Sequence, residues 1–403
     1  MLRAGLVGAA AGETRVSSRL ARSVLPSGPG GAALTIPPQH STRGAIDCDI
    51  HLNLPATSVL VPHFDAYWRE IVEMRCLDRD NFDTHNYPVN APLSARPDWR
   101  PGDKHHAKPA STLDQVRAQA LDPFGTRFAI CNVIHGAQAM YSEDLSAAFC
   151  SAINDWVRTE FLDHEPRLRA SIVVAGHGPE RAAEEIERCA ADLRFVGVLL
   201  LAMQELPLGR RQNWPIYRAA AKHGLPVNIH AGSSFRHATT SLGWPSYLLE
   251  DYVAQSAGFA GALNSLITEG VFVEFPGLKV VLMESGVTWL PAWMWRVTKT
   301  WRALRPEVPW NKVSPAEMLR RHVRVTLQPF DAPPRPEQTR RIIDEIGAEE
   351  MFLFSTDYPH WHFDGTNVIP EGLPESLVHR MLFDNPLETY PRLREESVKE
   401  TRR

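Results

Sequence analysis

The sequence predicts a (β/α)₈ barrel, also called a TIM barrel, in a chain of 403 residues. Short apolar segments alternate with helical segments after residue 44, eight apolar segments can be counted, and no hairpin turn signals separate them. The alternative is an open doubly wound sheet, which is disfavoured because no glycine-rich phosphate loop follows the first strand. The eight expected strands begin at Ala45, Arg127, Arg169, Phe195, Pro226, Lys279, Val323 and Met351.

The helices expected between these strands have recognisable start and stop signals. The segment 179–192 begins with a proline, and acidic residues follow closely, as at many helix starts. The segment 214–223 is followed by Gly224, which is typical of a helix C-terminus. Further helices are expected over 142–161, 247–270, 315–322 and 337–346.

The chain outside the alternating pattern divides into three parts. Residues 1–43 are rich in Ala, Gly, Ser and Arg and contain one acid, so we expect a flexible or disordered leader, with an organellar transit peptide as the alternative. Residues 44–395 form the single barrel domain. Within it, the loop-rich stretch 55–125 after the first strand is expected to be an insertion that serves as a lid or a subunit contact. Residues 396–403 are a tail.

Composition excludes several classes of protein. The 44% hydrophobic and 22% charged residues are ordinary for a soluble globular protein. The net charge of −4, without a run of basic residues, gives no reason to expect a nucleic-acid partner. No apolar stretch is long enough to predict a membrane span. The five cysteines are odd in number and lack C-x-x-C spacing, which predicts a reduced, cytoplasmic protein.

Polar residues follow four of the predicted strands at the end where barrel chemistry takes place. Asp49 and His51 are two residues apart in the first strand, so their side chains point to the same face. His230, Glu284 and Asp357 follow the fifth, sixth and eighth strands. Imidazoles and carboxylates that meet at one barrel mouth predict a divalent metal site. The alternative is a set of structural residues, with Asp357 as a helix N-cap.

Four motifs stand at predicted strands, in the order Ile46–His51, Leu225–Gly232, Phe275–Gly286 and Phe354–His360, and Asp384–Pro386 follows them as the start of a C-terminal helix. In this order they resemble the motifs of the amidohydrolase-related superfamily, in the branch that contains aminocarboxymuconate-semialdehyde and resorcylate-type decarboxylases. The resemblance covers roughly residues 45–392, nearly the whole predicted barrel.

The resemblance implies one divalent metal ion, Zn²⁺ or Mn²⁺ with Mg²⁺ possible, and no organic cofactor. The positions that match the family's ligands are Asp49, His51, His230 and Asp357. The family has His or Glu at the first of these positions, and a carboxylate there favours the harder ions Mn²⁺ and Mg²⁺. Many members have a catalytic histidine at position 284. A glutamate there can shuttle protons only with a raised pKa, and a purely structural role is the alternative.

The resemblance also implies a reaction. We expect a non-oxidative decarboxylase of a small aromatic or unsaturated carboxylic acid, in which Asp357 or Glu284 protonates the carbon that loses CO₂. The first alternative is a hydrolase of a lactone, amide or ester, in which Asp357 takes a proton from a metal-activated water. The second is a barrel that binds a ligand without turnover.

Two further residues are expected to bind the substrate. His360 matches a family position near the pocket, and Arg296 could pair with a substrate carboxylate or bridge to a helix acid. The tryptophan cluster of residues 289–301 is expected to be core or an oligomer contact. We therefore expect a small-molecule substrate as a partner, and the resemblance implies a homodimer or a larger homo-oligomer.

Overall fold

The computed structural model describes residues 41–79, 108–233, 243–360 and 369–394. By its internal contacts the chain divides into two units, residues 1–38 and 39–403. The first unit lies outside the described residues, as does nearly all of the predicted leader and the predicted tail. The predicted domain boundaries therefore stay predictions.

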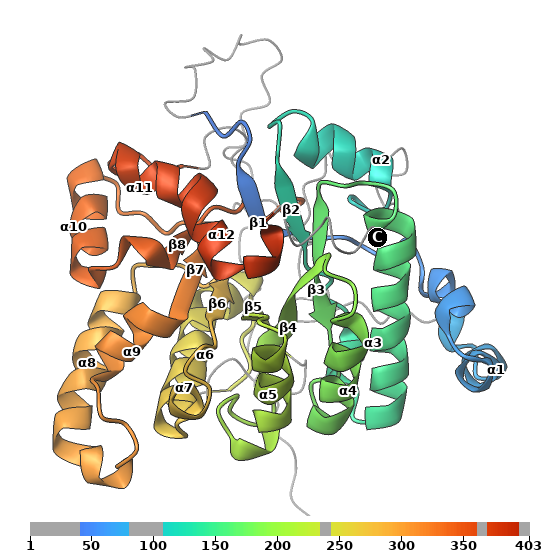
Figure 1. Ribbon diagram of the computed structural model, residues 1–403, viewed down its shortest axis with the longest axis horizontal. Coiled ribbons are helices and arrows are strands. Elements are labelled where there is room, and N and C mark those ends of the chain that lie inside the picture. The colour runs from blue at the N-terminus through green and yellow to red at the C-terminus, as the bar shows by residue number, and fades with distance from the viewer. Residues whose placement is uncertain (1–40, 80–107, 234–242, 361–368, 395–403) are drawn as a thin grey trace, which may run out of the picture. The chain divides into compact units, whose positions relative to one another are not determined.

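Eight parallel strands form one sheet in the order of the sequence, as a (β/α)₈ barrel requires (Figure 1). Each strand pairs in parallel with the next one along the chain. The predicted fold class is thus confirmed. The strands are β1 (Ile46–Ile50), β2 (Phe128–Cys131), β3 (Leu168–Val173), β4 (Phe195–Met203), β5 (Val227–Ser233), β6 (Val280–Met283), β7 (Val323–Thr326) and β8 (Phe352–Leu353).

The barrel is closed by backbone hydrogen bonds between β1 and the residues that follow β8. Cys48 N donates to the carbonyl of Phe354 over 3.0 Å, and His51 N donates to the carbonyl of Tyr358 over 2.7 Å. Asp357 N donates in turn to the carbonyl of Asp49 over 3.1 Å. Strand β8 itself has two residues. The closure therefore holds the polar ends of the first and last strands against each other.

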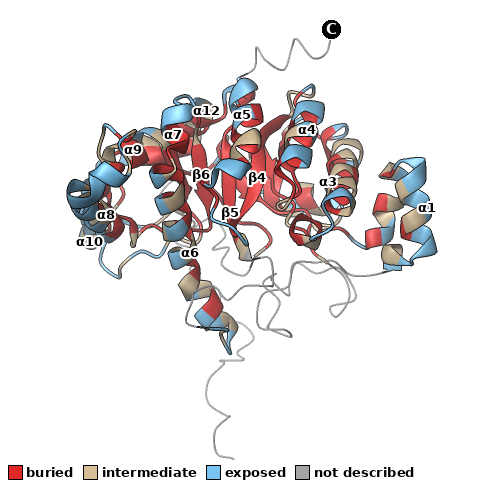
Figure 2. Cartoon of the chain, turned by 90° about the horizontal axis from the view of Figure 1, so that it is seen from below, coloured by how far each residue is buried: buried red, intermediate tan, exposed pale blue. Residues whose placement is uncertain are grey.

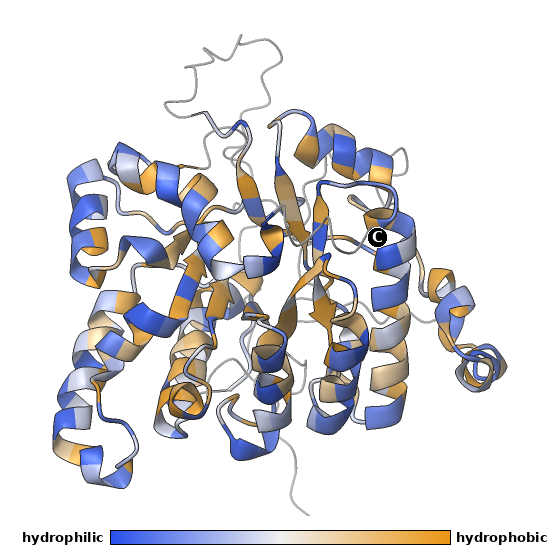
Figure 3. Cartoon of the chain, in the orientation of Figure 1, coloured by the Kyte–Doolittle hydropathy of each residue, from blue (hydrophilic) through white to orange (hydrophobic). Residues whose placement is uncertain are grey.

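Helices cover the outside of the barrel (Figures 1 and 3). Their apolar faces pack against the strands, and Figure 3 shows apolar and polar residues mixed along each helix. The helices that follow β2 to β5 are α3 (Glu143–Val157), α4 (Pro179–Cys189), α5 (Trp214–Lys222) and α6 (Leu248–Thr268). The later ones are α7 (Val271–Glu274), α8 (Leu290–Leu304), α9 (Pro315–His322), α10 (Pro336–Ile346), α11 (Glu375–His379) and α12 (Asn385–Thr389).

Two apolar clusters make up the core. The larger one lies between the strands and the helices, and Figure 2 shows the strands buried and the outer faces of the helices exposed. The smaller one contains residues of β1, β2, β4, β6 and β8, and strands so far apart can share a cluster only inside the barrel. Tyr390 and Leu393, near the end of the described chain, belong to this inner cluster.

The insertion after β1 is helical at both ends. Its described residues contain a 3₁₀ helix at Thr57–His63, the helix α1 (Ala66–Met74), the short helix α2 (Leu113–Val116) and a π-helical turn at Arg117–Leu121. These helical segments were not expected, because the composition of the insertion predicted loops. The centre of the insertion, 80–107, lies outside the described residues, so the predicted lid stays a prediction. No helix in the described ranges is long and apolar enough to cross a membrane.

Candidate active site

Residues from four strand ends meet at the carboxyl end of the barrel. Two groups of potential metal ligands lie there, and within each group the ligand atoms are all within 4.8 Å of one another. All but His360, which is partly exposed, are buried. His51 belongs to both groups and therefore links them. The first group is Asp49, His51 and His230, and the second is His51, Glu284, Asp357 and His360.

His51 is oriented from both ring nitrogens. Its Nδ1 lies 3.0 Å from the carbonyl oxygen of Asn132, and because a carbonyl only accepts, Nδ1 carries the hydrogen. Its Nε2 therefore faces the carboxylates, 3.0 Å from Asp357 Oδ1 and 3.6 Å from Asp49 Oδ1. A backbone carbonyl that fixes one nitrogen and leaves the other toward a cluster is the usual arrangement for a histidine that binds a metal.

His230 has the same arrangement. Its Nδ1 donates to the carbonyl of Ala231 over 2.7 Å, and its Nε2 lies 3.4 Å from Asp49 Oδ2. Among the described residues, neither of these two facing atoms makes a hydrogen bond, although both are fully buried. Burial lowers the pKa of His230, but the charges of Asp49 and Glu284 outweigh it and raise that pKa to about 9. Buried polar atoms without a hydrogen bond are rare and suit a bound cation.

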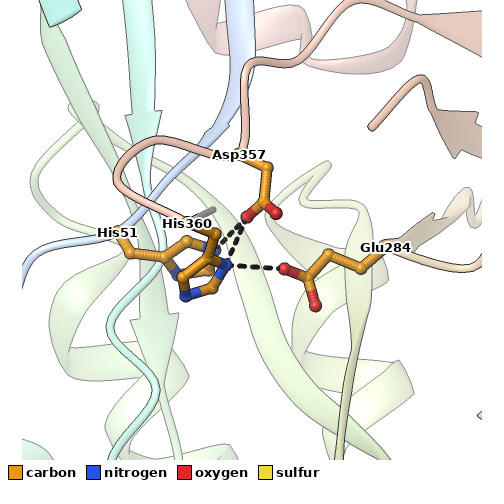
Figure 4. Close-up of side chains that lie close together, drawn as sticks. All are labelled: His51, Glu284, Asp357 and His360. Carbon is orange, nitrogen blue, oxygen red and sulfur yellow. Dashed lines mark hydrogen bonds and ion pairs between the residues drawn. The ribbon is translucent and has the colours of Figure 1, made fainter. Parts of the chain in front are cut away.

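Glu284 and Asp357 both lie against one ring nitrogen of His360 (Figure 4). Nδ1 of His360 lies 2.8 Å from Glu284 Oε1 and 2.7 Å from Asp357 Oδ1. The His360 ring stacks on His51 with the ring centroids 4.4 Å apart. Burial lowers the pKa of His360, but Asp357 and then Glu284 raise it well above the ordinary value. The group can therefore hold a proton beside the potential metal ligands.

Two of these residues have a backbone conformation that side chains rarely adopt. Glu284 has a φ of 58° and Asp357 a φ of 56°, both in the left-handed region. Only two other non-glycine residues in the described ranges, Cys76 and Ala110, have positive φ. Such strain costs roughly 1–2 kcal/mol per residue and is common at active sites. Both carboxylates lie against the same atom, His360 Nδ1.

Comparison with known proteins places the chain in a family. Residues 46–392 match the model of the amidohydrolase family. The chain belongs to the amidohydrolase family. A gamma-resorcylate decarboxylase from Polaromonas sp. is 26% identical to it over 265 residues, which span 62% of this chain and 78% of the relative.

Solved structures share the fold of this amidohydrolase. The 2,6-dihydroxybenzoate decarboxylase from Rhizobium superposes with a TM-score of 0.62 at 20% identity, covering 87% of this chain and 99% of its own. A dihydroxybenzoic acid decarboxylase from Polaromonas sp., which contains manganese and the inhibitor 2-nitroresorcinol, has a TM-score of 0.61 at 19% identity. It covers 88% of this chain and 99% of its own.

The donors present suit the predicted metal ion. Two imidazole nitrogens and carboxylate oxygens lie close together in buried positions, and this mixture is used for Zn²⁺ and Mn²⁺. Asp49, His51, His230 and Asp357, the four predicted ligands, all belong to the two groups of potential ligands. Glu284 and His360, predicted for catalysis and substrate binding, lie in the second group beside them.

Arg296 lies apart from the other predicted residues of the amidohydrolase site. It is exposed on α8 and borders a cavity of about 380 Å³ between α8 and α6, with Trp293 and Asn264 among its neighbours. No helix was predicted over the residues of α8, so the sequence could not place Arg296 relative to the strand ends. Within this chain, therefore, Arg296 is not brought to the metal ligands, and its role in substrate binding stays a prediction.

Three residues near the site were missed in the sequence. Asp47 is buried and accepts hydrogen bonds from Thr356 N and Oγ1, over 3.0 and 2.6 Å, so it ties β1 to the residue before Asp357. Its two-residue spacing from Asp49 was a usable signal. Asn132 follows β2 and donates to Asp49 over 2.8 Å. Tyr252 of α6 hydrogen-bonds to Glu284, and nothing local in the sequence marks it.

Proposed function

We propose that this amidohydrolase is a metal-dependent decarboxylase that removes CO₂ from a small aromatic carboxylic acid without an oxidant. The observation that carries the proposal is a group of potential metal ligands with hydrogen-bonded residues beside it. The potential ligands are Asp49, His51, His230 and Asp357. Asp357 is also hydrogen-bonded, through His360, to Glu284. The decarboxylase relatives support the same reaction. Manganese in the Polaromonas structure supports Mn²⁺ as the metal.

In this proposal Asp49, His51, His230 and Asp357 hold the cation. When bound, the cation supplies positive charge that orients the substrate's oxygens and offsets negative charge that develops during the reaction. Asp49 and His230 contribute the two buried atoms that make no hydrogen bond, Oδ2 and Nε2. The backbone carbonyls of Asn132 and Ala231 keep both imidazoles directed at the same place.

The chemical step needs a proton at one carbon. The bond between the ring carbon and the carboxylate breaks, its electron pair stays on the ring carbon, CO₂ leaves, and that carbon takes up one proton. His360 Nδ1 lies within hydrogen-bond distance of both Asp357 and Glu284, so the proton can come from this group and can be returned to it through His360. Surrounding burial keeps bulk water away from the carboxylates.

A reaction in D₂O tests the proposal. Purified protein, freed of metal and reloaded with Mn²⁺, is incubated with hydroxybenzoic acids. We expect equal amounts of CO₂ and a decarboxylated product that carries one deuterium at the carbon that held the carboxylate. Lactones, amides and esters are assayed in parallel in H₂¹⁸O. Turnover of one of these, with ¹⁸O in the product and no decarboxylation of any acid, would show a hydrolase instead.

Metal content tests the ligands separately from activity. Wild-type protein from metal-supplemented expression should hold about one divalent ion per chain, whereas His230→Ala and Asp357→Ala should hold little. The matched control is His379→Ala, which removes an exposed histidine on α11. The ligand assignment is wrong if wild-type protein contains no stoichiometric ion, or if His230→Ala retains as much as the control.

A further inference from the structure

A chain of hydrogen bonds runs through the inside of the barrel from Tyr390 to Asp49. Tyr390 OH is 3.0 Å from Asn228 Oδ1, and Asn228 Nδ2 is 2.8 Å from Ser171 Oγ. Ser171 Oγ is 2.6 Å from Asn132 Oδ1, and Asn132 Nδ2 is 2.8 Å from Asp49 Oδ1. All five residues are at most 3% exposed. This series of hydrogen bonds thus joins the inner apolar cluster, to which Tyr390 belongs, to the candidate metal site.

Every donor in this chain points toward Asp49. An ionised carboxylate only accepts, so Asn132 must present its NH₂ to Asp49 and its oxygen to Ser171. Ser171 then donates to Asn132 and accepts from Asn228, whose oxygen is left for the hydroxyl of Tyr390. Because the orientation at each step fixes the next, the chain has one arrangement as long as Asp49 is ionised. Hydrogen bonds aligned in this way polarise one another.

Asn132 hydrogen-bonds to both metal-ligand candidates at the end of β1, Asp49 and His51. Its side chain holds Asp49 Oδ1, and its backbone carbonyl accepts from His51 Nδ1 over 3.0 Å. With Oδ1 occupied, Asp49 directs Oδ2 toward His230 Nε2, 3.4 Å away. The atoms that face the predicted cation are therefore those that Asn132 leaves available.

We propose that Asn132, Ser171, Asn228 and Tyr390 are positioning residues for the metal site. They hold the Asp49 carboxylate in the one rotation that offers Oδ2 to the cation, and they link that rotation to the C-terminal segment inside the barrel. The inference rests on the proposed metal site but not on the reaction. It requires no contact between these four residues and the substrate.

A merely structural role makes a different prediction. Loss of a buried hydrogen bond weakens the fold whatever its position, so a drop in stability alone says nothing about the metal. Metal affinity is the readout that separates the roles, because outer partners of metal ligands typically contribute 10- to 100-fold to affinity.

The experiment measures Mn²⁺ affinity of metal-free protein by competition with a chelator at pH 7, together with urea unfolding of the same samples. Asn132→Ala should weaken Mn²⁺ binding by about 10- to 100-fold. Ser171→Ala and Tyr390→Phe should weaken it by smaller factors, falling with distance along the chain. The matched control is Tyr217→Phe, which removes a buried hydroxyl that donates to the Leu208 carbonyl over 2.7 Å, outside this chain.

The outcomes are distinct. The proposal holds if Tyr390→Phe and Ser171→Ala lose Mn²⁺ affinity while Tyr217→Phe loses only stability. It is overturned if the variants of these hydrogen-bonded residues unfold more easily but bind Mn²⁺ as tightly as wild type. Ser171→Ala, the smallest change, keeps the test decisive if Asn132→Ala does not fold. A wild-type protein that binds Mn²⁺ but decarboxylates nothing would refute the proposed reaction and leave this inference standing.

Discussion

At the scale of the residue, Glu284 is the proposed partner of Asp357 in proton transfer. It accepts from His360, is buried, and is held in a left-handed backbone conformation. If it shares the proton with Asp357, Glu284→Gln should lower kcat for decarboxylation by about 10²–10⁴-fold, because general acid catalysis contributes that much. The Mn²⁺ content should not change, because the amide preserves the shape. Steady-state kinetics and metal analysis of the same preparation check both expectations.

The control for this variant is Glu345→Gln on the exposed face of α10. An unchanged kcat in Glu284→Gln would show that Glu284 has a purely structural role, which is the alternative that the sequence analysis left open. A loss of Mn²⁺ would show instead that Glu284 is a ligand.

The sequence could predict which candidate metal ligands lie close together because each is in, or within a few residues of, a strand that has a clear apolar pattern. Parallel strands bring their carboxyl ends together, so Asp49, His230 and Asp357 had to meet once the barrel was assigned. Asn132 and Tyr252 could not be found in this way. Their importance comes from which side chains they contact across the barrel, and spacing along the chain does not encode such contacts.

At the scale of the element, Glu165 joins the insertion to the barrel. It lies just before β3 and accepts from Arg117, at the start of the π-helical turn of the insertion, over 2.7 Å. Arg167 donates to both carboxylate oxygens of Glu165, over 2.8 and 3.0 Å. Arg167 is the largest cause that lowers the pKa of Glu165, and it overcomes the effect of burial to bring that pKa to about 2.

This shift predicts a pH-dependent stability. The ordinary pKa of Glu165 is 4.5 and its folded value about 2, so the stabilisation is fully present above pH 4.5 and is lost as pH falls toward 2. Glu165→Gln should cost about 2 kcal/mol at pH 7, a value reduced for the partial exposure of both arginines. The difference from wild type should shrink between pH 4.5 and 2, as measured by urea unfolding.

The control is Glu184→Gln on α4, whose partner Arg181 is about half exposed. This pair should make no measurable difference at any pH, since exposed ion pairs contribute little. A pH-independent loss in Glu165→Gln would mean that packing, and not charge, explains its effect.

Most strands and helices of the barrel were predictable, and helix α8 is one that was not. Helix α8 contains tryptophans on both faces: Trp293 is 9% exposed and Trp295 is 59% exposed. A helix recognised by one apolar face does not stand out when its outer face also carries large apolar side chains. The tryptophan cluster of residues 289–301 was expected to be core or an oligomer contact; Trp293 is part of the core, and the oligomer contact stays a prediction. Strand β8, by contrast, was predicted although it is only two residues long, because its short apolar run ends abruptly in a polar motif.

At the scale of the whole molecule, the barrel is closed twice. Backbone hydrogen bonds join β1 to the residues after β8, and the C-terminal segment closes the opposite end. There Arg392, which is 8% exposed, donates to the carbonyls of Ala190, Phe195 and His223 over 3.2, 3.0 and 3.3 Å. These carbonyls lie up to 202 residues earlier in the chain. A single side chain thus connects the C-terminal segment to the region where β4 and β5 begin.

Arg392→Met should therefore destabilise the whole barrel. Methionine keeps much of the apolar stem but leaves the buried carbonyls without a donor, which should cost about 2–4 kcal/mol. Arg394→Met, two residues away and exposed, is the matched control and should behave as wild type. Urea unfolding followed by both tryptophan fluorescence and far-UV circular dichroism should show one earlier transition for Arg392→Met. Separate transitions for the two signals would mean that the C-terminal segment detaches alone, and that barrel stability does not depend on it.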